Sequence, residues 1–264
     1  MNNLMKIMNR DVSNLCILGD IHSGIKELES VINQARSRGI NKFISVGDLV
    51  DRGQFPNEVI QLVSQMIKNQ ELFLFYGNHD WKLIRHFRGQ KVNIAEEQAL
   101  TLKLMTSKSI DMYLDIFQDN PIAIYDPVKK IFLSHAAGGR PENILYNDFK
   151  KSTFHNFNTF TDYLSDTKDK FIDKKYVSNL MYGITNGQVE SSGRPVRLPL
   201  TTSINDTLDN WTVFFGHIHS NNLFPEGNRR VVCVDFSCSE PGGTLCGLII
   251  GDDATIKEEN VLFA

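Results

Sequence analysis

The stretch from residue 15 to residue 53, LCILGDIHSGIKELESVINQARSRGINKFISVGDLVDRG, decides the fold class of this chain. Its apolar run at residues 15–18 predicts a buried strand, and the apolar spacing of residues 26–38 predicts a helix after it. The alternation continues with a strand over 42–46, a helix over 57–68 and a strand over 72–76. Strands that alternate with helices in this way indicate parallel strands with helices on their faces, which is the α/β class.

The remainder of the chain changes pattern twice. A polar, helical-looking segment begins near residue 95 and is interpreted as a small helical insert at about residues 90–120. Residues 143–209 are rich in Asn, Thr, Asp and Ser and predict loops with one or two helices. The other strands are expected at 122–124, 131–134, 212–215, 230–235 and 244–250, with a final edge strand within 255–263. No repeat or linker divides the chain, so residues 1–264 are predicted to form one domain.

The bulk composition excludes some classes of function. A formal net charge of -3 does not favour a long groove for nucleic acid, although a small basic pocket for one phosphate is compatible with it. The four cysteines, Cys16, Cys233, Cys238 and Cys246, form no CxxC pair and are interpreted as reduced thiols. The N-terminal residues lack the apolar stretch of a signal peptide, and no apolar run is long enough to cross a membrane. We therefore expect a cytoplasmic protein without a membrane partner.

Short polar clusters follow directly after five of the predicted strands. In an open α/β sheet, ligands bind just outside the carboxyl ends of the strands, so these clusters are expected to converge on one place. They are Gly19-Asp20-Ile21-His22, Gly47-Asp48 with Asp51-Arg52-Gly53, Gly77-Asn78-His79-Asp80, Ser134-His135-Ala136 and Gly216-His217-Ile218-His219.

The residue types in these clusters indicate a metal site. Carboxylate, imidazole and amide oxygen together suit divalent Mn, Fe, Zn or Ni, whereas a thiolate site would need cysteines. Glycine precedes four of the clusters and permits a tight turn that aims the next side chain inward. If one carboxylate bridges two ions, the cluster residues can hold the paired metals used for in-line phosphoryl displacement.

The ordered pattern GDxH, GDxxDRG, GNHD, SHA and GHxH resembles that of the calcineurin-like metallophosphoesterase superfamily. The resemblance extends from about Leu15 to Ile250, which is nearly all of the chain. It implies a two-sheet α/β/β/α sandwich, here with the small helical insert, and a binuclear site at one edge of the sheets. It also implies an enzyme, a hydrolase acting on phosphate esters, with two divalent metal ions as cofactors, of which manganese is the expected one and Fe, Ni or Zn the alternatives.

Each site residue acquires a role from the motif that contains it. The resemblance implies a hydroxide that bridges the metals and attacks phosphorus, with His79 as general acid beside Asp51 and with Arg52 binding the substrate phosphate. Asp51 also has a simpler interpretation as a helix cap, because Asp is favoured at such positions. The metal ligands implied are Asp20, His22 and His219 for the first ion, the last directly or through water, Asn78, His135 and His217 for the second, and Asp48 as the bridge between them.

One branch of the superfamily resembles the chain most. Residues 181–197, MYGITNGQVESSGRPVR, resemble the phosphatase module of bacterial polynucleotide kinase-phosphatases, which is itself similar to the phosphoprotein phosphatases. Arg194 and Arg197 in this segment are candidate substrate contacts. Two departures put the substrate in question, because the first motif is GDIHS rather than GDIHG and the last contains the additional His219. His86 and His155 match no motif and are expected to have no role in the site.

The substrate remains open between several classes. The branch implies hydrolysis of phosphomonoesters and of 2′,3′-cyclic phosphates at nucleotides or RNA ends. The alternatives are a protein Ser/Thr or Tyr phosphatase, a dinucleoside tetraphosphate hydrolase and, as a remote possibility, a non-catalytic scaffold of the same fold. The partner is therefore expected to be a phosphorylated small molecule, a nucleic-acid end or a phosphoprotein. A scaffold would lack some metal ligands, and none is missing from the motifs.

Overall fold

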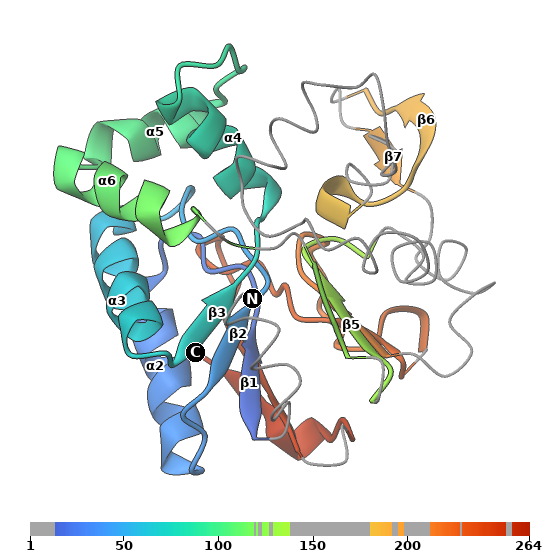
Figure 1. Cartoon of the computed structure of the whole chain (residues 1–264). Helices are drawn as coiled ribbons and strands as arrows, with labels where there is room; N and C mark the ends of the chain where they lie inside the picture. Colours follow the sequence, from blue (N-terminus) through green and yellow to red (C-terminus); the bar gives the residue numbers. More distant parts are fainter. Residues whose placement is uncertain are drawn as a thin grey trace, which may run out of the picture.

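The computed structural model describes residues 14–118, 120, 123–126, 129–137, 180–191, 195–197, 212–227, 229–251 and 255–264. Two sheets lie side by side, and the helices α2 and α3 cover the outer face of the first (Figure 1). This mixed α/β arrangement confirms the predicted fold class. None of the described helices is both long enough and apolar enough to cross a membrane. All four cysteines are buried and carry free thiols, as predicted.

The first sheet has five strands in the order β11-β10-β1-β2-β3. Its parallel part is formed by β1 (Leu15–Leu18), β2 (Phe43–Ser45) and β3 (Leu72–Leu74), within the ranges predicted from the sequence. β10 (Cys246–Ile250) pairs antiparallel with β1, and β11 (Val261–Phe263) is the edge strand expected near the end of the chain. Because β1, β2 and β3 run parallel, their carboxyl ends lie at the same edge of the sheet.

The second sheet has the order β4-β5-β8-β9, and three of its strands run parallel. Its strands are β4 (Ala123–Asp126), β5 (Ile131–Ser134), β8 (Thr212–Phe215) and β9 (Val231–Cys233). A separate two-stranded sheet is formed by β6 (Thr185–Val189) and β7 (Pro195–Arg197). The loops-and-helices prediction for residues 143–209 is wrong at these two strands, because the five exposed residues of β6 lack the alternating apolar pattern of a half-buried strand. Most of that segment lies outside the described residues.

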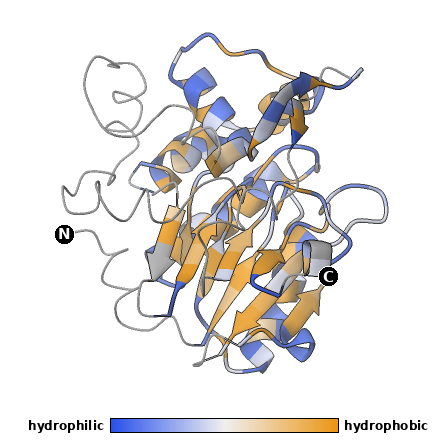
Figure 2. Ribbon diagram, turned by 90° about the vertical axis from the view of Figure 1, so that its right-hand side faces the viewer, coloured by the Kyte–Doolittle hydropathy of each residue, from blue (hydrophilic) through white to orange (hydrophobic). Residues whose placement is uncertain are grey.

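The buried apolar residues form two clusters, and the smaller one joins the two sheets. Leu15 and Ile17 of β1 belong to the same apolar cluster as Leu133 and Phe214 of the second sheet. The alternate residues of β1 belong to the cluster that includes the buried face of α2, which comprises Leu28, Val31, Ile32 and Ala35. Every residue of β1 is therefore buried, which explains why its sequence is an unbroken apolar run. Figure 2 shows the same concentration of hydrophobic residues in the strands.

The helices place additional polar groups near the strand ends. α2 (Ile25–Ser37) and α3 (Pro56–Lys68) begin one residue before the predicted helices. α5 (Glu96–Leu104) and α6 (Ser107–Ile116) occupy the interval expected to be a helical insert, and α6 packs against α3. α4 (Asn78–Phe87) was not expected, although its buried residues Trp81 and Ile84 follow helical spacing. It starts directly at the third polar cluster and so fixes that cluster at a helix N-terminus.

Candidate metal centre

The carboxyl ends of both sheets converge on one group of polar side chains. β1, β2 and β3 of the first sheet end just before Asp20, Asp48 and Asn78, and β5 and β8 of the second end at His135 and His217. The described residues contain two groups with the chemistry of a metal site, and Asp48 belongs to both. This is the sharing expected of a bridging carboxylate.

The first group consists of Asp20, His22 and Asp48, and all three are almost completely buried. His22 Nε2 lies 4.0 Å from Asp20 Oδ2 and 3.9 Å from Asp48 Oδ2. His22 Nδ1 lies 3.1 Å from the carbonyl oxygen of Val50, a contact that suits an N–H donor at this atom. The ring is thereby oriented with Nε2 directed at the two carboxylates, as in many metal-binding histidines.

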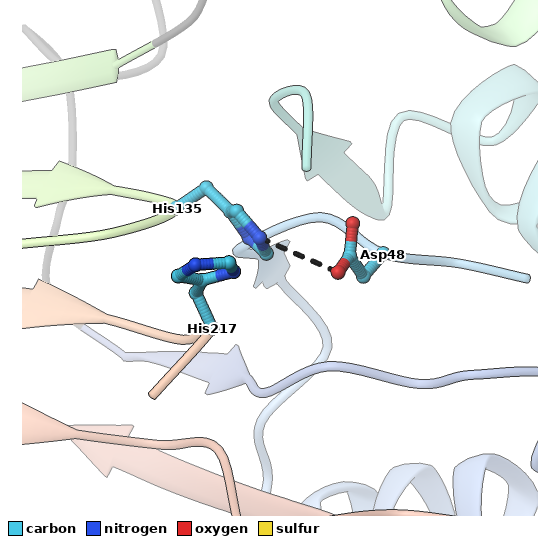
Figure 3. Close-up of side chains that lie close together, drawn as sticks. All are labelled: Asp48, His135 and His217. Carbon is cyan, nitrogen blue, oxygen red and sulfur yellow. Dashed lines mark ion pairs between the residues drawn. The ribbon is translucent and has the colours of Figure 1, made fainter. Parts of the chain in front are cut away.

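The second group consists of Asp48, His135 and His217 (Figure 3). His135 Nε2 lies 3.4 Å from Asp48 Oδ2 and 2.9 Å from Asn78 Oδ1, so the amide lies beside this group, and its role as a ligand stays a prediction. His135 Nδ1 lies 2.9 Å from the carbonyl oxygen of Val46, which repeats the orientation of His22. The rings of His135 and His217 have centroids 5.0 Å apart.

The charges of the site favour a bound cation. Burial, together with the negative charges of Asp235 and Asp48, holds the pKa of Asp20 well above its usual range. Burial alone would raise the pKa of Asp48 too, but the charges of His135 and other nearby histidines hold it well below. Three buried carboxylates so close together need compensating positive charge. Two carboxylates with three histidines and an amide therefore fit divalent cations.

The ligands are carried by unusual backbone. His22, Asp48 and His217 have φ values of 46°, 51° and 63°, in the left-handed region that residues other than glycine seldom occupy. Such strain is often found at functional sites. The neighbouring glycines are needed mainly for close approach, because a Cβ at Gly216 would lie 2.0 Å from Asp20 Oδ1 and one at Gly77 would lie 1.9 Å from Asp48 Oδ1.

His79 and Asp51 form the pair expected from the sequence. His79 Nδ1 lies 2.7 Å from Asp51 Oδ2, and the backbone N–H of His79 donates to Asp48 Oδ1 at 2.9 Å. Burial lowers the pKa of His79, but the charge of Asp48 and the contact with Asp51 outweigh it and raise the pKa above its usual value. His79 is thus held beside the bridging carboxylate in a setting that favours the protonated ring, and its role as an acid stays a prediction.

His219 and Arg52 lie together at one side of the first group. Arg52 Nη1 lies 3.0 Å from His219 Nε2 and also donates to a carboxylate oxygen of Glu240. His219 lies outside both three-residue groups, with Nε2 3.8 Å from Asp235 Oδ2 and Nδ1 3.5 Å from Glu240 Oε2. Its role as a ligand of the first ion stays a prediction. Asp235 is 1% exposed, and its Oδ2 has no hydrogen-bond partner among the described residues, so a further acceptor faces this side of the site.

Arg197 lies at the opposite side, beside the second group. Its Nη2 lies 2.8 Å from His217 Nε2, and its Nε donates to the carbonyl oxygen of Tyr182 at 3.1 Å. The segment that suggested a substrate contact therefore does bring an arginine to the centre. Arg194, the other candidate of that segment, lies outside the described residues, as does His155.

Asp80 is a buried acceptor of several hydrogen bonds next to Asp48, and the sequence analysis did not anticipate this role. Asp80 accepts hydrogen bonds from the backbone N–H groups of Asp48 at 2.6 Å, Leu49 at 3.1 Å and Gly77 at 3.2 Å. The hydroxyl of Tyr113, on α6, donates to the same carboxylate at 2.6 Å. Asp80 belongs to the GNHD motif, but the sequence analysis assigned it no role. Nothing in the sequence pattern pointed to Tyr113, nor to Asp235 or Glu240, which follow the last motif.

The comparisons with known proteins agree with this geometry. The model of the calcineurin-like phosphoesterase family matches residues 13–221. An asymmetrical bis(5′-nucleosyl)-tetraphosphatase PrpE of Oceanobacillus iheyensis is 25% identical over 84% of this chain and 83% of its own length. A symmetrical bis(5′-nucleosyl)-tetraphosphatase of Buchnera aphidicola is 26% identical over 92% and 97%.

Solved structures share the fold at lower identity. A protein serine/threonine phosphatase from Saccharomyces cerevisiae superposes with a TM-score of 0.57 and 15% identity, over 97% of this chain and 81% of that one. A cold-active protein-tyrosine phosphatase of a Shewanella species gives 0.54 and 17%, over 94% and 80%. Since the family model covers most of the chain and the described residues contain two groups that could hold a metal ion, this protein belongs to the calcineurin-like phosphoesterase family and is a metal-dependent hydrolase.

Proposed function

We propose that this enzyme hydrolyses dinucleoside polyphosphates, with a dinucleoside tetraphosphate as the preferred substrate. The observation that carries the proposal is the placement of one guanidinium group at each side of the metal centre. Arg52 contacts His219 beside the first group, and Arg197 contacts His217 beside the second. Similarity to two bis(5′-nucleosyl)-tetraphosphatases over most of the chain supports the same substrate class.

The number of positive charges distinguishes the substrate classes. A cyclic phosphodiester carries one negative charge and a monoester about two, whereas the four phosphates of a dinucleoside tetraphosphate carry about four and extend over several ångströms. Planar guanidinium groups bind phosphate oxygens in pairs and stay charged at all relevant pH values. Arginines at both ends of a dinuclear centre therefore suit an extended polyanion better than a single phosphate group.

The residues of the chain have separable tasks. Two divalent ions, of which manganese is expected, would be held by Asp20, His22, Asp48, Asn78, His135, His217 and His219, and would supply an activated water and positive charge for the developing transition state. Arg52 and Arg197 bind phosphate oxygens and align the chain of phosphates. His79, oriented by Asp51, donates a proton to a leaving group that needs one.

Hydrolysis of phosphomonoesters and 2′,3′-cyclic phosphates, as expected from the sequence, stays a prediction for the same site. It is supported by the resemblance of residues 181–197 to the phosphatase module of bacterial polynucleotide kinase-phosphatases, and Arg197 of that segment contacts His217. A phosphoprotein substrate would use the same metals and is a further outcome of the experiment below.

A substrate panel tests the proposal. The purified enzyme is loaded with Mn²⁺ and incubated with diadenosine tetraphosphate, 2′,3′-cyclic AMP, 5′-AMP and a phosphoserine peptide at equal concentration, and the products are separated by chromatography. We expect the highest kcat/KM for diadenosine tetraphosphate, with Asp48→Asn inactive on all substrates. Brisk hydrolysis of the peptide or of the cyclic nucleotide, with the dinucleotide intact, would overturn the proposed substrate class.

A further inference from the structure

We infer that Tyr182 forms a nucleobase-binding subsite at the outer side of the second ligand group. This inference rests on the proposed nucleotide substrate and adds where one base of that substrate binds. Tyr182 is 39% exposed and is one of the exposed large hydrophobic side chains among the described residues. Its ring lies edge-on to His217, with centroids 6.2 Å apart and planes at 88°.

The position of Tyr182 is fixed from both sides. It ends a short helical turn at residues 180–182, whose first two side chains are buried in the core. The carbonyl oxygen of Leu180 accepts a hydrogen bond at 2.7 Å from the N–H of Ala136, the residue after His135. The carbonyl oxygen of Tyr182 accepts from Arg197 Nε at 3.1 Å. The ring is therefore presented from a constrained backbone, which lowers the entropic cost of stacking a ligand on it.

The groups around the ring have the chemistry that a nucleotide requires. Arg197 lies between Tyr182 and His217, so a phosphate bound by the guanidinium would have its nucleoside within reach of the aromatic face.

Exposed aromatic side chains elsewhere lack these neighbours. Among the described residues, the other exposed large hydrophobic side chains are Phe55, Leu100, Val189 and Phe263, and none of them has a ring contact with a residue of the two ligand groups. Phe263, in the edge strand β11, makes an edge contact with the ring of Phe236, with centroids 5.0 Å apart. It therefore offers a matched control, because its removal also deletes an exposed ring with one aromatic neighbour.

Binding of 5′-AMP and of ribose 5-phosphate, each used as its phosphonate analogue with a C–P bond that the enzyme cannot hydrolyse, tests the subsite without turnover. The two ligands share the phosphate and the sugar and differ by the base, so their affinity ratio for the Mn²⁺-loaded enzyme, measured by calorimetry, isolates the contribution of the base. Stacking of one base on one aromatic side chain typically changes affinity by roughly 5- to 150-fold. We expect a preference for 5′-AMP in that range for the wild type, Tyr182→Phe and Phe263→Leu, and a ratio near one for Tyr182→Leu.

Kinetics provide the second readout. Tyr182→Leu is expected to raise KM for diadenosine tetraphosphate about tenfold or more, whereas Tyr182→Phe, which keeps the aromatic ring, should keep the wild-type KM. Equal affinity of the wild type for the two ligands, or a base preference that survives in Tyr182→Leu, would overturn the subsite. If diadenosine tetraphosphate is not hydrolysed but the base preference depends on Tyr182, the proposed function fails and the subsite stands. If diadenosine tetraphosphate is hydrolysed but no base preference depends on Tyr182, the proposed function stands and the subsite fails.

Discussion

Removal of the Tyr113 hydroxyl should weaken metal binding at a distance. In Tyr113→Phe, Asp80 loses a buried donor at 2.6 Å but keeps its contacts with the N–H groups of Asp48, Leu49 and Gly77. A buried hydrogen bond to a charged group is worth about 1.5–3 kcal/mol, so we expect unfolding free energy to fall by about that amount. Because Asp80 holds the backbone of the bridging ligand, whose φ of 51° is itself strained, the ligand should also lose orientation.

The expected loss of Mn²⁺ affinity in Tyr113→Phe is estimated from residues that support metal ligands in other proteins. Loss of a hydrogen-bond partner behind a metal ligand typically lowers affinity about 10–100-fold. The pKa of Asp80 is raised to about 7 by burial and by the charge of Asp48, so the measurements belong at pH 8, where its carboxylate is ionised and acts as an acceptor. Mn²⁺ affinity is measured by calorimetry, and stability by urea unfolding of chelator-treated protein.

Tyr76→Phe is the matched control. Its hydroxyl donates to the carbonyl oxygen of Phe117, and its ring stacks on the same phenylalanine that contacts Tyr113. It removes one buried hydroxyl from the same aromatic cluster without touching Asp80. We expect a stability loss of about 0.5–1.5 kcal/mol and unchanged Mn²⁺ affinity. Wild-type Mn²⁺ affinity in Tyr113→Phe, or an equal loss in Tyr76→Phe, would refute the reasoning.

The other predictions concern residues at the centre itself. Asp48→Ala should lose both metal ions, because its carboxylate belongs to both ligand groups; two equivalents found by elemental mass spectrometry would contradict a shared bridge. His79→Ala should slow hydrolysis of 5′-AMP about 10²–10⁴-fold, since an alkoxide needs a proton, while diadenosine tetraphosphate and p-nitrophenyl phosphate, with weakly basic leaving groups, lose much less. A uniform loss on all three would remove His79 from the role of acid. Glu240→Gln should release Arg52 from its ion pair, in which the Arg52 side chain is 20% exposed and that of Glu240 is 37% exposed. Inorganic phosphate should then inhibit the enzyme about two- to fivefold more tightly. Unchanged or weaker inhibition would show that Arg52 does not reach the bound phosphate.

The sequence predicted the location of the site best where a polar side chain directly follows an apolar strand. Asp20, Asp48 and His135 each stand directly after a buried run, and parallel strands bring such positions together whatever the details of the intervening helices. The convergence of these clusters could therefore be predicted from the strand pattern, whereas the division of the ligands between two ions came from the resemblance to the family. The mixed α/β class and the final edge strand followed from the same apolar patterns.

The features that sequence reasoning missed depend on contacts between distant elements. Tyr113 reaches Asp80 from α6, and Glu240 reaches Arg52 from a turn beyond the last motif. Neither contact leaves a periodic signal, because each involves a single side chain whose partner is set by packing. The strand β6 was missed for a related reason, since all five of its residues are exposed and its sequence is that of a loop.

The shared carboxylate also ties the completeness of the centre to the packing of the two sheets. Asp20, His22 and Asp48 all come from the first sheet, whereas the second group adds His135 and His217 from the other sheet. The span of chain that must be closed is about sixfold longer for the second group, a difference of about 1.6 kcal/mol in closure entropy for an unfolded chain. The second group therefore forms only where the two sheets are packed against each other, and His219, the further ligand proposed for the first ion, also follows β8 of the second sheet. A complete set of ligands is in this sense a mark of completed folding.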